Sequence, residues 1–279
     1  MMDDRLISVV LWIMGVSAIA WRWPGLRGTT LLAPVVWVVI ALTTVAALAL
    51  IAPLPASTEP EKLTLRWHWY LAATSTFCPP MALFGAKRPQ HGPWQFIVIS
   101  LWLVLLLPAI DFGTARGGGT AVGLHPAQAW FLAGLVFMAA SNYLPTRFAV
   151  SSLLFTSAQV CLLLGFQPLT IPLALSVGAI LMVCLQGTPP RTVPPLDRVW
   201  LDFRDAFGVV WGLRVQQRVN QSAEMHGWNA RLNWHGFTSR DGGSISPQTE
   251  KALRNSLNNV LRRFVSPKWI ADRLGEALS

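Results

Sequence analysis

Apolar residues dominate the first two thirds of the chain in long stretches, and polar residues return regularly only in the last third. The stretch from Phe148 to Gln186 is a long uncharged run, with no Asp, Glu, Lys or Arg in 39 residues. A helix that spans a bilayer needs about 20 apolar residues, so this run is long enough for two spans. A break lies at Gly165-Phe166-Gln167-Pro168, where the two would separate. The pattern predicts a polytopic transmembrane helix bundle.

Similar stretches upstream extend the set of candidate spans to residues 6–21, 30–52, 68–86, 94–111, 127–144, 148–165 and 169–186. The stretch 68–86 is the weakest, because Thr74-Ser75-Thr76 makes it polar and Cys78-Pro79-Pro80 interrupts its hydrogen-bond ladder. Proline is tolerated in a spanning helix when neighbours satisfy the freed carbonyl groups. We therefore expect six or seven spans in a transmembrane helical domain of residues 1–186, with 68–86 as a kinked helix.

The positions of Lys and Arg favour seven spans, with the N-terminus outside and the C-terminus in the cytoplasm. Cytoplasmic loops of membrane proteins are enriched in these residues. In this topology the inside loops carry Arg22, Arg27, Lys87, Arg88 and Arg147, and the outside loops carry Arg5, Lys62, Arg66 and Arg116. The sequence thus predicts a multi-pass protein of the cell (inner) membrane.

The composition agrees with this class of protein. Hydrophobic residues make up 53% of the chain and charged residues 13%, whereas charged residues approach about a quarter in soluble domains. The formal net charge is +9. In a membrane protein such an excess usually reflects cytoplasmic loops, so we expect membrane lipids and no nucleic acid as partners.

Residues that carry out catalysis or bind metals are not recognisable in the sequence. The cysteines Cys78, Cys161 and Cys184 are odd in number, lie in apolar stretches and form no CxxC pair, so neither disulfides nor a zinc site is indicated. His226 and His235 have no Cys or carboxylate at metal-binding spacing. No HExxH, GxSxG or paired-carboxylate pattern occurs. We predict no catalytic residues, no cofactor and no metal, and favour a protein that is not an enzyme.

Neutral polar residues within the apolar stretches are the remaining candidates for a binding site. Their usual role is hydrogen bonding between helices, which contributes about 0.6 kcal/mol each, and we prefer this role to ligand binding. Ionisable groups at mid-membrane depth, which proton relays and ion-coupled carriers need, are missing from the predicted spans. The candidates for lining a cavity are Thr74, Ser75, Thr76, Ser141, Asn142 and Gln159.

The last third predicts a small soluble cytoplasmic α+β domain, mostly helical, over residues 196–279. A linker at 187–195 precedes it and contains four prolines, which is typical of a stiff, extended spacer. Leu196, Trp200, Phe203 and Phe207 recur at helical spacing, and this pattern continues to about residue 226.

A hairpin and two helices are predicted after this first helix. Apolar and polar residues alternate over 228–235, which indicates a strand, and Asp241-Gly242-Gly243 is a turn that would return a second strand through Ile245. Ser246 and Ser266, each followed by proline, are expected N-caps of two helices. A basic face that could contact lipid or a partner comprises Arg254, Arg262, Arg263 and Lys268.

Three functions remain in competition on the sequence alone. The leading one is a non-catalytic membrane scaffold or assembly protein that binds a protein partner through residues 196–279. A second is a transporter or channel for a neutral or lipidic small molecule. The third is a lipid-modifying enzyme at the membrane interface, with His91, Lys87 and Arg88 near a headgroup. Two short sequence segments are distinctive but indicate no activity, namely Asn142-Tyr143-Leu144-Pro145-Thr146-Arg147 and Asp202-Phe203-Arg204-Asp205.

Overall fold

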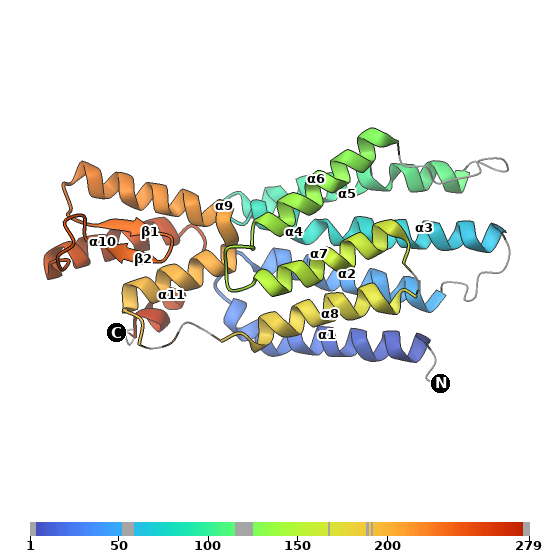
Figure 1. The fold of residues 1–279 in the computed structure, drawn as a ribbon, viewed down its shortest axis with the longest axis horizontal. Coiled ribbons are helices and arrows are strands. Elements are labelled where there is room, and N and C mark those ends of the chain that lie inside the picture. The colour runs from blue at the N-terminus through green and yellow to red at the C-terminus, as the bar shows by residue number, and fades with distance from the viewer. Residues whose placement is uncertain are drawn as a thin grey trace.

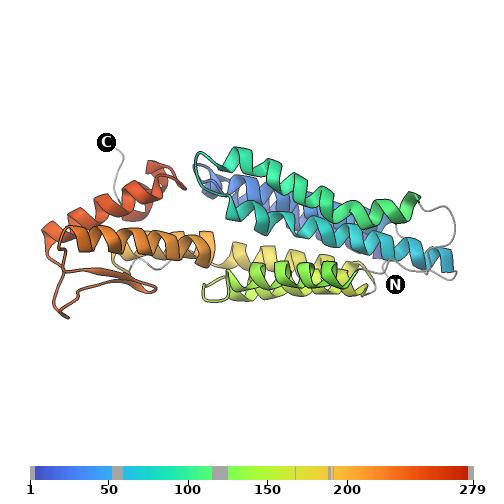
Figure 2. The same ribbon diagram turned by 90° about the horizontal axis from the view of Figure 1, so that it is seen from above.

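The computed structural model describes residues 4–51, 59–114, 125–166, 168–187, 190 and 192–275, and their side chains except those of 59–64 and 109–114. This part of the chain is mostly helical and contains a two-stranded antiparallel sheet. Helices α1 to α8, between residues 4 and 185, lie in one half of the molecule, and α9 to α11, between residues 195 and 274, pack with the sheet in the other half (Figures 1 and 2). The predicted predominantly helical fold with a small hairpin is confirmed.

The long helices form a bundle. Its helices are α1 (Asp4–Leu26), α2 (Leu32–Ile51), α3 (Glu59–Thr76), α4 (Cys78–Phe84), α5 (His91–Thr114), α6 (Pro126–Ser141), α7 (Ala149–Leu164) and α8 (Thr170–Leu185). Helix α8 packs against α1 and α7, and α2 packs against α3 and α4. These bounds follow the seven apolar stretches closely, except that α1 ends later and α3 begins earlier than expected. The expected break at Cys78-Pro79-Pro80 separates α3 from α4.

Three helical segments in the described ranges are long and apolar enough to cross a membrane. They are α1, α2 and the His91–Pro108 part of α5. Helices α6, α7 and α8 are apolar but have 16 residues each, and 16 residues extend about 24 Å against a hydrocarbon core of about 30 Å. The bundle of six or seven spans therefore stays a prediction.

The other half of the molecule is the C-terminal unit, residues 195–275. It comprises α9 (Pro195–Met225), β1 (Arg231–Asn233), β2 (Gly236–Thr238), α10 (Pro247–Leu261) and α11 (Pro267–Leu274). The hydroxyl oxygens of Ser246 and Ser266 accept hydrogen bonds from the backbone N–H groups of Thr249 and Trp269. Both predicted N-caps are therefore confirmed. Residues 188, 189 and 191 of the predicted linker, and 276–279 of the predicted domain, lie outside the described residues.

The hairpin differs from the prediction. Leu232 pairs with Phe237, and Asn233 with Gly236, so the turn is at Trp234-His235 and not at Asp241-Gly242-Gly243. Trp234 leaves the strand because its own polar groups bond elsewhere. Its indole N–H donates to the Pro145 carbonyl at 3.0 Å, and its carbonyl accepts from other residues of the unit.

Helix α9 also differs, because it is sharply kinked. Gly208 has φ 76° and ψ −174°, which no α-helical residue adopts. The kink joins two helical segments that we expected to be one continuous helix. Helix α9 still carries the core of the unit, since Trp200, Phe203 and Phe207 are fully buried against α10 and α11.

The core of the C-terminal unit extends into the bundle. Leu83 at the end of α4 and Ala86 just after it belong to the same buried cluster as Trp211 and Phe264. The Trp211 indole N–H donates to the Leu83 carbonyl at 3.0 Å, and Thr29 forms a β-bridge with Val265. The C-terminal unit is therefore packed directly against the end of the bundle.

Candidate functional site

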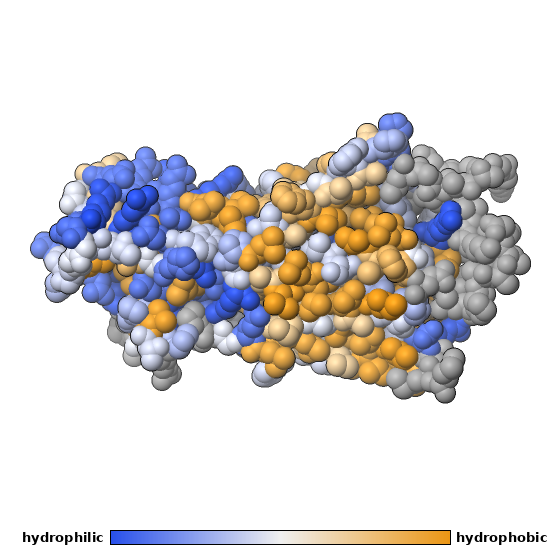
Figure 3. Space-filling model, viewed as in Figure 1, coloured by the Kyte–Doolittle hydropathy of each residue, from blue (hydrophilic) through white to orange (hydrophobic). Residues whose placement is uncertain are grey.

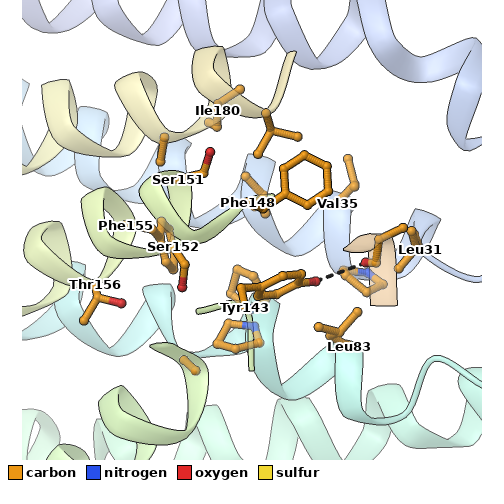
Figure 4. Close-up of a pocket in the computed structure, with 18 of the residues that line it drawn as sticks. Leu31, Val35, Leu83, Tyr143, Phe148, Ser151, Ser152, Phe155, Thr156 and Ile180 are labelled. Carbon is orange, nitrogen blue, oxygen red and sulfur yellow. Dashed lines mark hydrogen bonds between the residues drawn. The ribbon is translucent and has the colours of Figure 1, made fainter. Parts of the chain in front are cut away.

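A cavity lies where the bundle meets the C-terminal unit. Its volume is about 370 Å³, and binding sites for small molecules measure about 300–1,000 Å³. Helices of the bundle supply most of the wall, and Ala206 of α9 closes one side. Figure 4 shows the side chains that surround it, among them Leu31, Val35, Leu83, Phe148, Phe155 and Ile180.

The wall of the cavity is apolar apart from four hydroxyl groups. They belong to Tyr143, Ser151, Ser152 and Thr156. The Ser152 hydroxyl donates to the Ala140 carbonyl at 3.3 Å, whereas the buried Ser151 hydroxyl has no hydrogen-bond partner in the described part of the chain. A charged ligand would lose its hydration here without compensation. The cavity thus suits a neutral, apolar molecule.

Tyr143 connects the cavity to the kink in α9. Its hydroxyl donates to the Ala206 carbonyl at 3.2 Å, the bond drawn dashed in Figure 4. In a regular helix this carbonyl would accept from the N–H group of Val210, four residues on. The Tyr143 hydroxyl therefore replaces the bond that the kink removes.

Asn142 satisfies the other side of the same kink. Its carbonyl accepts from the Val209 N–H group at 2.9 Å, and its side-chain oxygen accepts from the Val210 N–H group at 3.0 Å. The first N–H groups of a helix have no partner within the helix. Asn142 therefore acts as the N-cap of the second half of α9, although it lies 67 residues before Val209 in the sequence.

Beside the cavity, three arginines and two aspartates form what we call the junction network. Asp202 accepts from Arg147 at 2.7 Å and from Arg273 at 2.5 Å. Asp205 pairs with Arg204 at 2.6 Å and lies 3.5 Å from the Arg147 Nε atom. Both aspartates are buried, with 2% of their surface exposed. The network ties the α6–α7 loop, α9 and α11 to one another.

Aromatic rings cover the arginines of the junction network. The Arg273 guanidinium lies 3.6 Å from the ring centroid of Trp269, and that of Arg204 lies 4.9 Å from Trp234. Burial lowers the pKa of Arg273, and Asp202 opposes this effect. Each carboxylate is thus held by cations, so neither is free to act as a general acid or base.

The two distinctive segments of the sequence contact each other at the kink of α9 and in the junction network. Residues 142–147 supply the N-cap, the tyrosine and one arginine, and residues 202–205 supply the buried ion pairs. Both aspartates are buried, a placement that the apolar stripe of Leu196, Trp200, Phe203 and Phe207 does not predict. The sequence does contain a signal for this burial, because the two aspartates are close neighbours of residues in the apolar stripe. Buried carboxylates require cationic partners.

The six polar residues predicted to line a cavity lie outside the wall of the one described above. The hydroxyls of Thr74, Ser75 and Thr76 donate to the carbonyls three residues earlier at 2.9, 2.7 and 2.7 Å. Ser141 donates to the Met138 carbonyl at 3.2 Å, and the Asn142 side-chain oxygen accepts from the Val210 N–H group at the kink. That any of them contacts a ligand stays a prediction.

Gln159 compensates for the proline break between α3 and α4. Its side-chain amide donates to the Thr76 carbonyl at 3.0 Å, and the residue is fully buried. This carbonyl has lost its helical partner, because Pro80, four residues on, has no N–H group. Gln159 therefore supplies the bond that the kinked helix needs.

We expect Gln159→Leu to lower the free energy of unfolding by about 1–3 kcal/mol, since it leaves a buried carbonyl without a donor. Gln159→Asn is less informative because its shorter amide cannot reach the same atom. Thermal unfolding in detergent, with Ser157→Leu on the exposed face of the same helix as control, would measure the effect. Equal midpoints for the two variants would contradict this role.

The predicted basic face is divided between two elements. Arg262, Arg263 and Lys268 are exposed around the start of α11, and Arg254 on α10 is half-buried. Arg263 approaches the bundle, since its carbonyl accepts from the Arg88 N–H group at 2.8 Å. Whether this face contacts lipid or a partner stays a prediction.

Comparison of the chain with protein-family models, with curated proteins and with solved structures finds no match. Among the described residues, no group of three His, Cys, Asp or Glu side chains is placed to hold a metal ion. The cavity and the junction network are therefore the features of this chain that bear on its function.

Proposed function

We propose that this chain is a multi-pass membrane protein that binds a neutral, lipid-like molecule in the cavity between its bundle and its C-terminal unit. The observation that carries the proposal is the apolar wall of that cavity, which includes the unpartnered Ser151 hydroxyl. Binding at this place would change the contacts of Tyr143 and Ala206, so the C-terminal unit would respond to the ligand.

The surface of the bundle supports a membrane location. Large apolar side chains are exposed on this surface. Among them, Phe96 has 74%, Trp130 79% and Phe137 74% of its surface accessible to solvent. Figure 3 shows a broad apolar surface over the bundle and a largely hydrophilic surface over the C-terminal unit. Soluble monomers rarely expose apolar patches larger than a few hundred Å². A bilayer would cover this surface.

The proposal includes seven spans, with α3 and α4 together as the third. Under it the loops that carry Arg27, Lys87, Arg88 and Arg147 share one end of the bundle with the C-terminal unit, which would be the cytoplasmic end. A reporter active only in the cytoplasm, fused after Ser279, should then be active. A fusion in the loop between α2 and α3 should be inactive. The reverse result would refute this orientation.

The cavity can be tested by filling it. Ala179 on α8 lines the wall, whereas Ala174 on the same helix is exposed. We expect Ala179→Phe to weaken binding of a fluorescent fatty-acyl probe by about tenfold or more, since the ring would displace the ligand and overpacking itself costs about 1–3 kcal/mol. The measurement is a titration of the full-length protein in nanodiscs.

Ala174→Phe is the matched control for this experiment and should bind the probe as the natural protein does. A thermal unfolding curve for each variant would show whether the fold is kept. Equal binding by both variants would contradict the cavity as the binding site.

A second candidate function is a membrane scaffold that presents residues 196–279 to a protein partner. The junction network favours it, because Arg147 in the α6–α7 loop of the bundle forms ion pairs with the buried Asp202 and Asp205 of the C-terminal unit. Gentle extraction followed by mass spectrometry should then recover a stoichiometric partner, which a chain truncated after Gly187 should lose. Recovery of the full chain alone under several mild conditions would contradict this candidate.

A further inference from the structure

Four cations from three separate segments gather on the face of the molecule where the bundle ends. We call Lys87, Arg214, Arg218 and Arg263 the basic cluster. Lys87 follows α4, Arg214 and Arg218 lie one turn apart on α9, and Arg263 follows α10. Arg214, Arg218 and Arg263 are exposed, and Lys87 is half-buried. None of the four forms an ion pair with a carboxylate of the described residues.

Trp211 holds part of this cluster in place. The Lys87 ammonium lies 5.9 Å from the centroid of its ring, and the Arg214 guanidinium lies 5.1 Å from the same ring. The ring is fixed in turn by the bond from its indole N–H to the Leu83 carbonyl at 3.0 Å. Two cations are therefore held beside one buried aromatic side chain, which is unfavourable for two like charges unless an anion lies near them.

Electrostatics around Lys87 lead to the same conclusion. Burial lowers its pKa, and the neighbouring charges of Arg263, Arg214 and Arg218 lower it further. Arg214 and Arg218 also repel each other, because like charges four residues apart destabilise a helix. A bound anion would relieve each of these repulsions.

We propose that the basic cluster binds the phosphate-bearing headgroup of an anionic phospholipid in the cytoplasmic leaflet. Lys87 follows α4 at the end of the bundle that packs against the C-terminal unit. On the face shown in Figure 3, the surface changes from apolar over the bundle to largely hydrophilic over that unit. This is the level at which headgroups would lie beside an embedded bundle. The inference depends on the membrane location proposed above but not on the cavity.

The cluster differs from the basic face expected from the sequence, and Arg263 belongs to both. Lys87 and Arg214 are brought together only by the packing of the α4–α5 loop against α9. A headgroup bound here would contact the bundle and the C-terminal unit at once. The lipid would therefore reinforce the junction from outside, on surface that the junction network does not reach.

The test titrates the full-length protein in detergent with phosphatidylglycerol or phosphatidylcholine of identical acyl chains, followed by native mass spectrometry. We expect the natural chain to prefer phosphatidylglycerol. Each basic residue near the surface contributes about fivefold to such binding, so Arg214→Gln with Arg218→Gln should weaken phosphatidylglycerol binding by about 25-fold. Phosphatidylcholine binding should not change.

Arg231→Gln with Lys251→Gln removes the same charge from exposed positions on β1 and α10 and is the matched control. It should keep the preference for phosphatidylglycerol. Without anionic lipid, the Arg214 and Arg218 variant should unfold at the same temperature as the natural chain or higher, because a repulsion is removed. A structural role for these arginines would instead lower the unfolding temperature.

Several results would overturn the inference. Equal binding of the two lipids by the natural chain would refute headgroup binding by the basic cluster. It would not contradict ligand binding in the cavity, since the acyl chains of the two lipids are identical. An equal loss in the control variant would show a general charge effect. Binding of pyrophosphate as tight as that of phosphatidylglycerol would identify a soluble anion as the ligand in place of the lipid.

Discussion

Asp202→Ala should lower the free energy of unfolding by about 3–5 kcal/mol, which is typical when one member of a buried ion pair is removed. Asp202 is buried and bonded to Arg147 at 2.7 Å and to Arg273 at 2.5 Å. Its removal leaves two partly buried guanidinium groups without their shared carboxylate. Unfolding in detergent, followed by circular dichroism, would measure the loss.

The chain offers a matched control in the exposed pair of Arg240 and Glu224. These groups lie 3.2 Å apart, with side chains 42% and 66% exposed, and exposed pairs contribute about 0–1 kcal/mol. Arg240→Ala should therefore have a small effect. Hydrogen exchange should also rise in residues 142–148 of the Asp202 variant and stay unchanged in the control. Comparable stabilities for both variants would show that the junction network does not hold the C-terminal unit.

The bundle helices were predictable because their signal is local. A run of apolar residues with a helix-breaking Gly or Pro at each end determines a helix without knowledge of its neighbours, and α7 and α8 match the predicted stretches to within one residue. The same holds for Ser246 and Ser266, since an N-cap bonds to a group three residues away. Short-range chemistry is readable from the sequence.

The site was not predictable because its contacts join distant segments. Arg147 and Asp202 are 55 residues apart, and Leu83 and Trp211 are 128 apart. In the sequence, Arg147 is one more basic residue of a short loop, and its charge was used there only to orient the bundle. The hairpin was misplaced for the same reason, because Trp234 continues the alternation of the strand while its indole bonds to Pro145.

The hydrogen bond from Gln159 to the Thr76 carbonyl could not be predicted from the sequence. The prolines at 79 and 80 predicted correctly that carbonyl groups would be freed, and the role of polar residues as bonds between helices was anticipated. Which residue supplies the bond to the Thr76 carbonyl depends on the packing of α7 against α3. Several polar side chains in the apolar stretches were equally eligible.

Gly208→Ala should destabilise the protein about as strongly as the loss of Asp202. A backbone with positive φ and ψ near 180° is essentially restricted to glycine and costs other residues about 1–3 kcal/mol, and Gly208 has φ 76° and ψ −174°. A Cβ atom here would also lie 2.6 Å from the Asn142 Cγ atom and 2.8 Å from its carbonyl oxygen. Because Asn142 caps the second half of α9, the helix cannot move away without losing both cap bonds.

Gly242 allows the backbone cost to be measured apart from the contact with Asn142. It has the same φ of 76°, and no atom lies within 4 Å of a Cβ atom added there. Gly242→Ala should cost only the backbone term, about 1–2 kcal/mol, and the excess at Gly208 measures the contact with Asn142. Asn142→Ala alone should cost about 1 kcal/mol as a lost cap. The double variant should cost less than the sum of its parts, because truncating Asn142 removes its Cγ atom but not its carbonyl. Additive losses in this cycle, measured by thermal unfolding, would mean that Gly208 and Asn142 do not meet, and that the α6–α7 loop does not set the kink of α9.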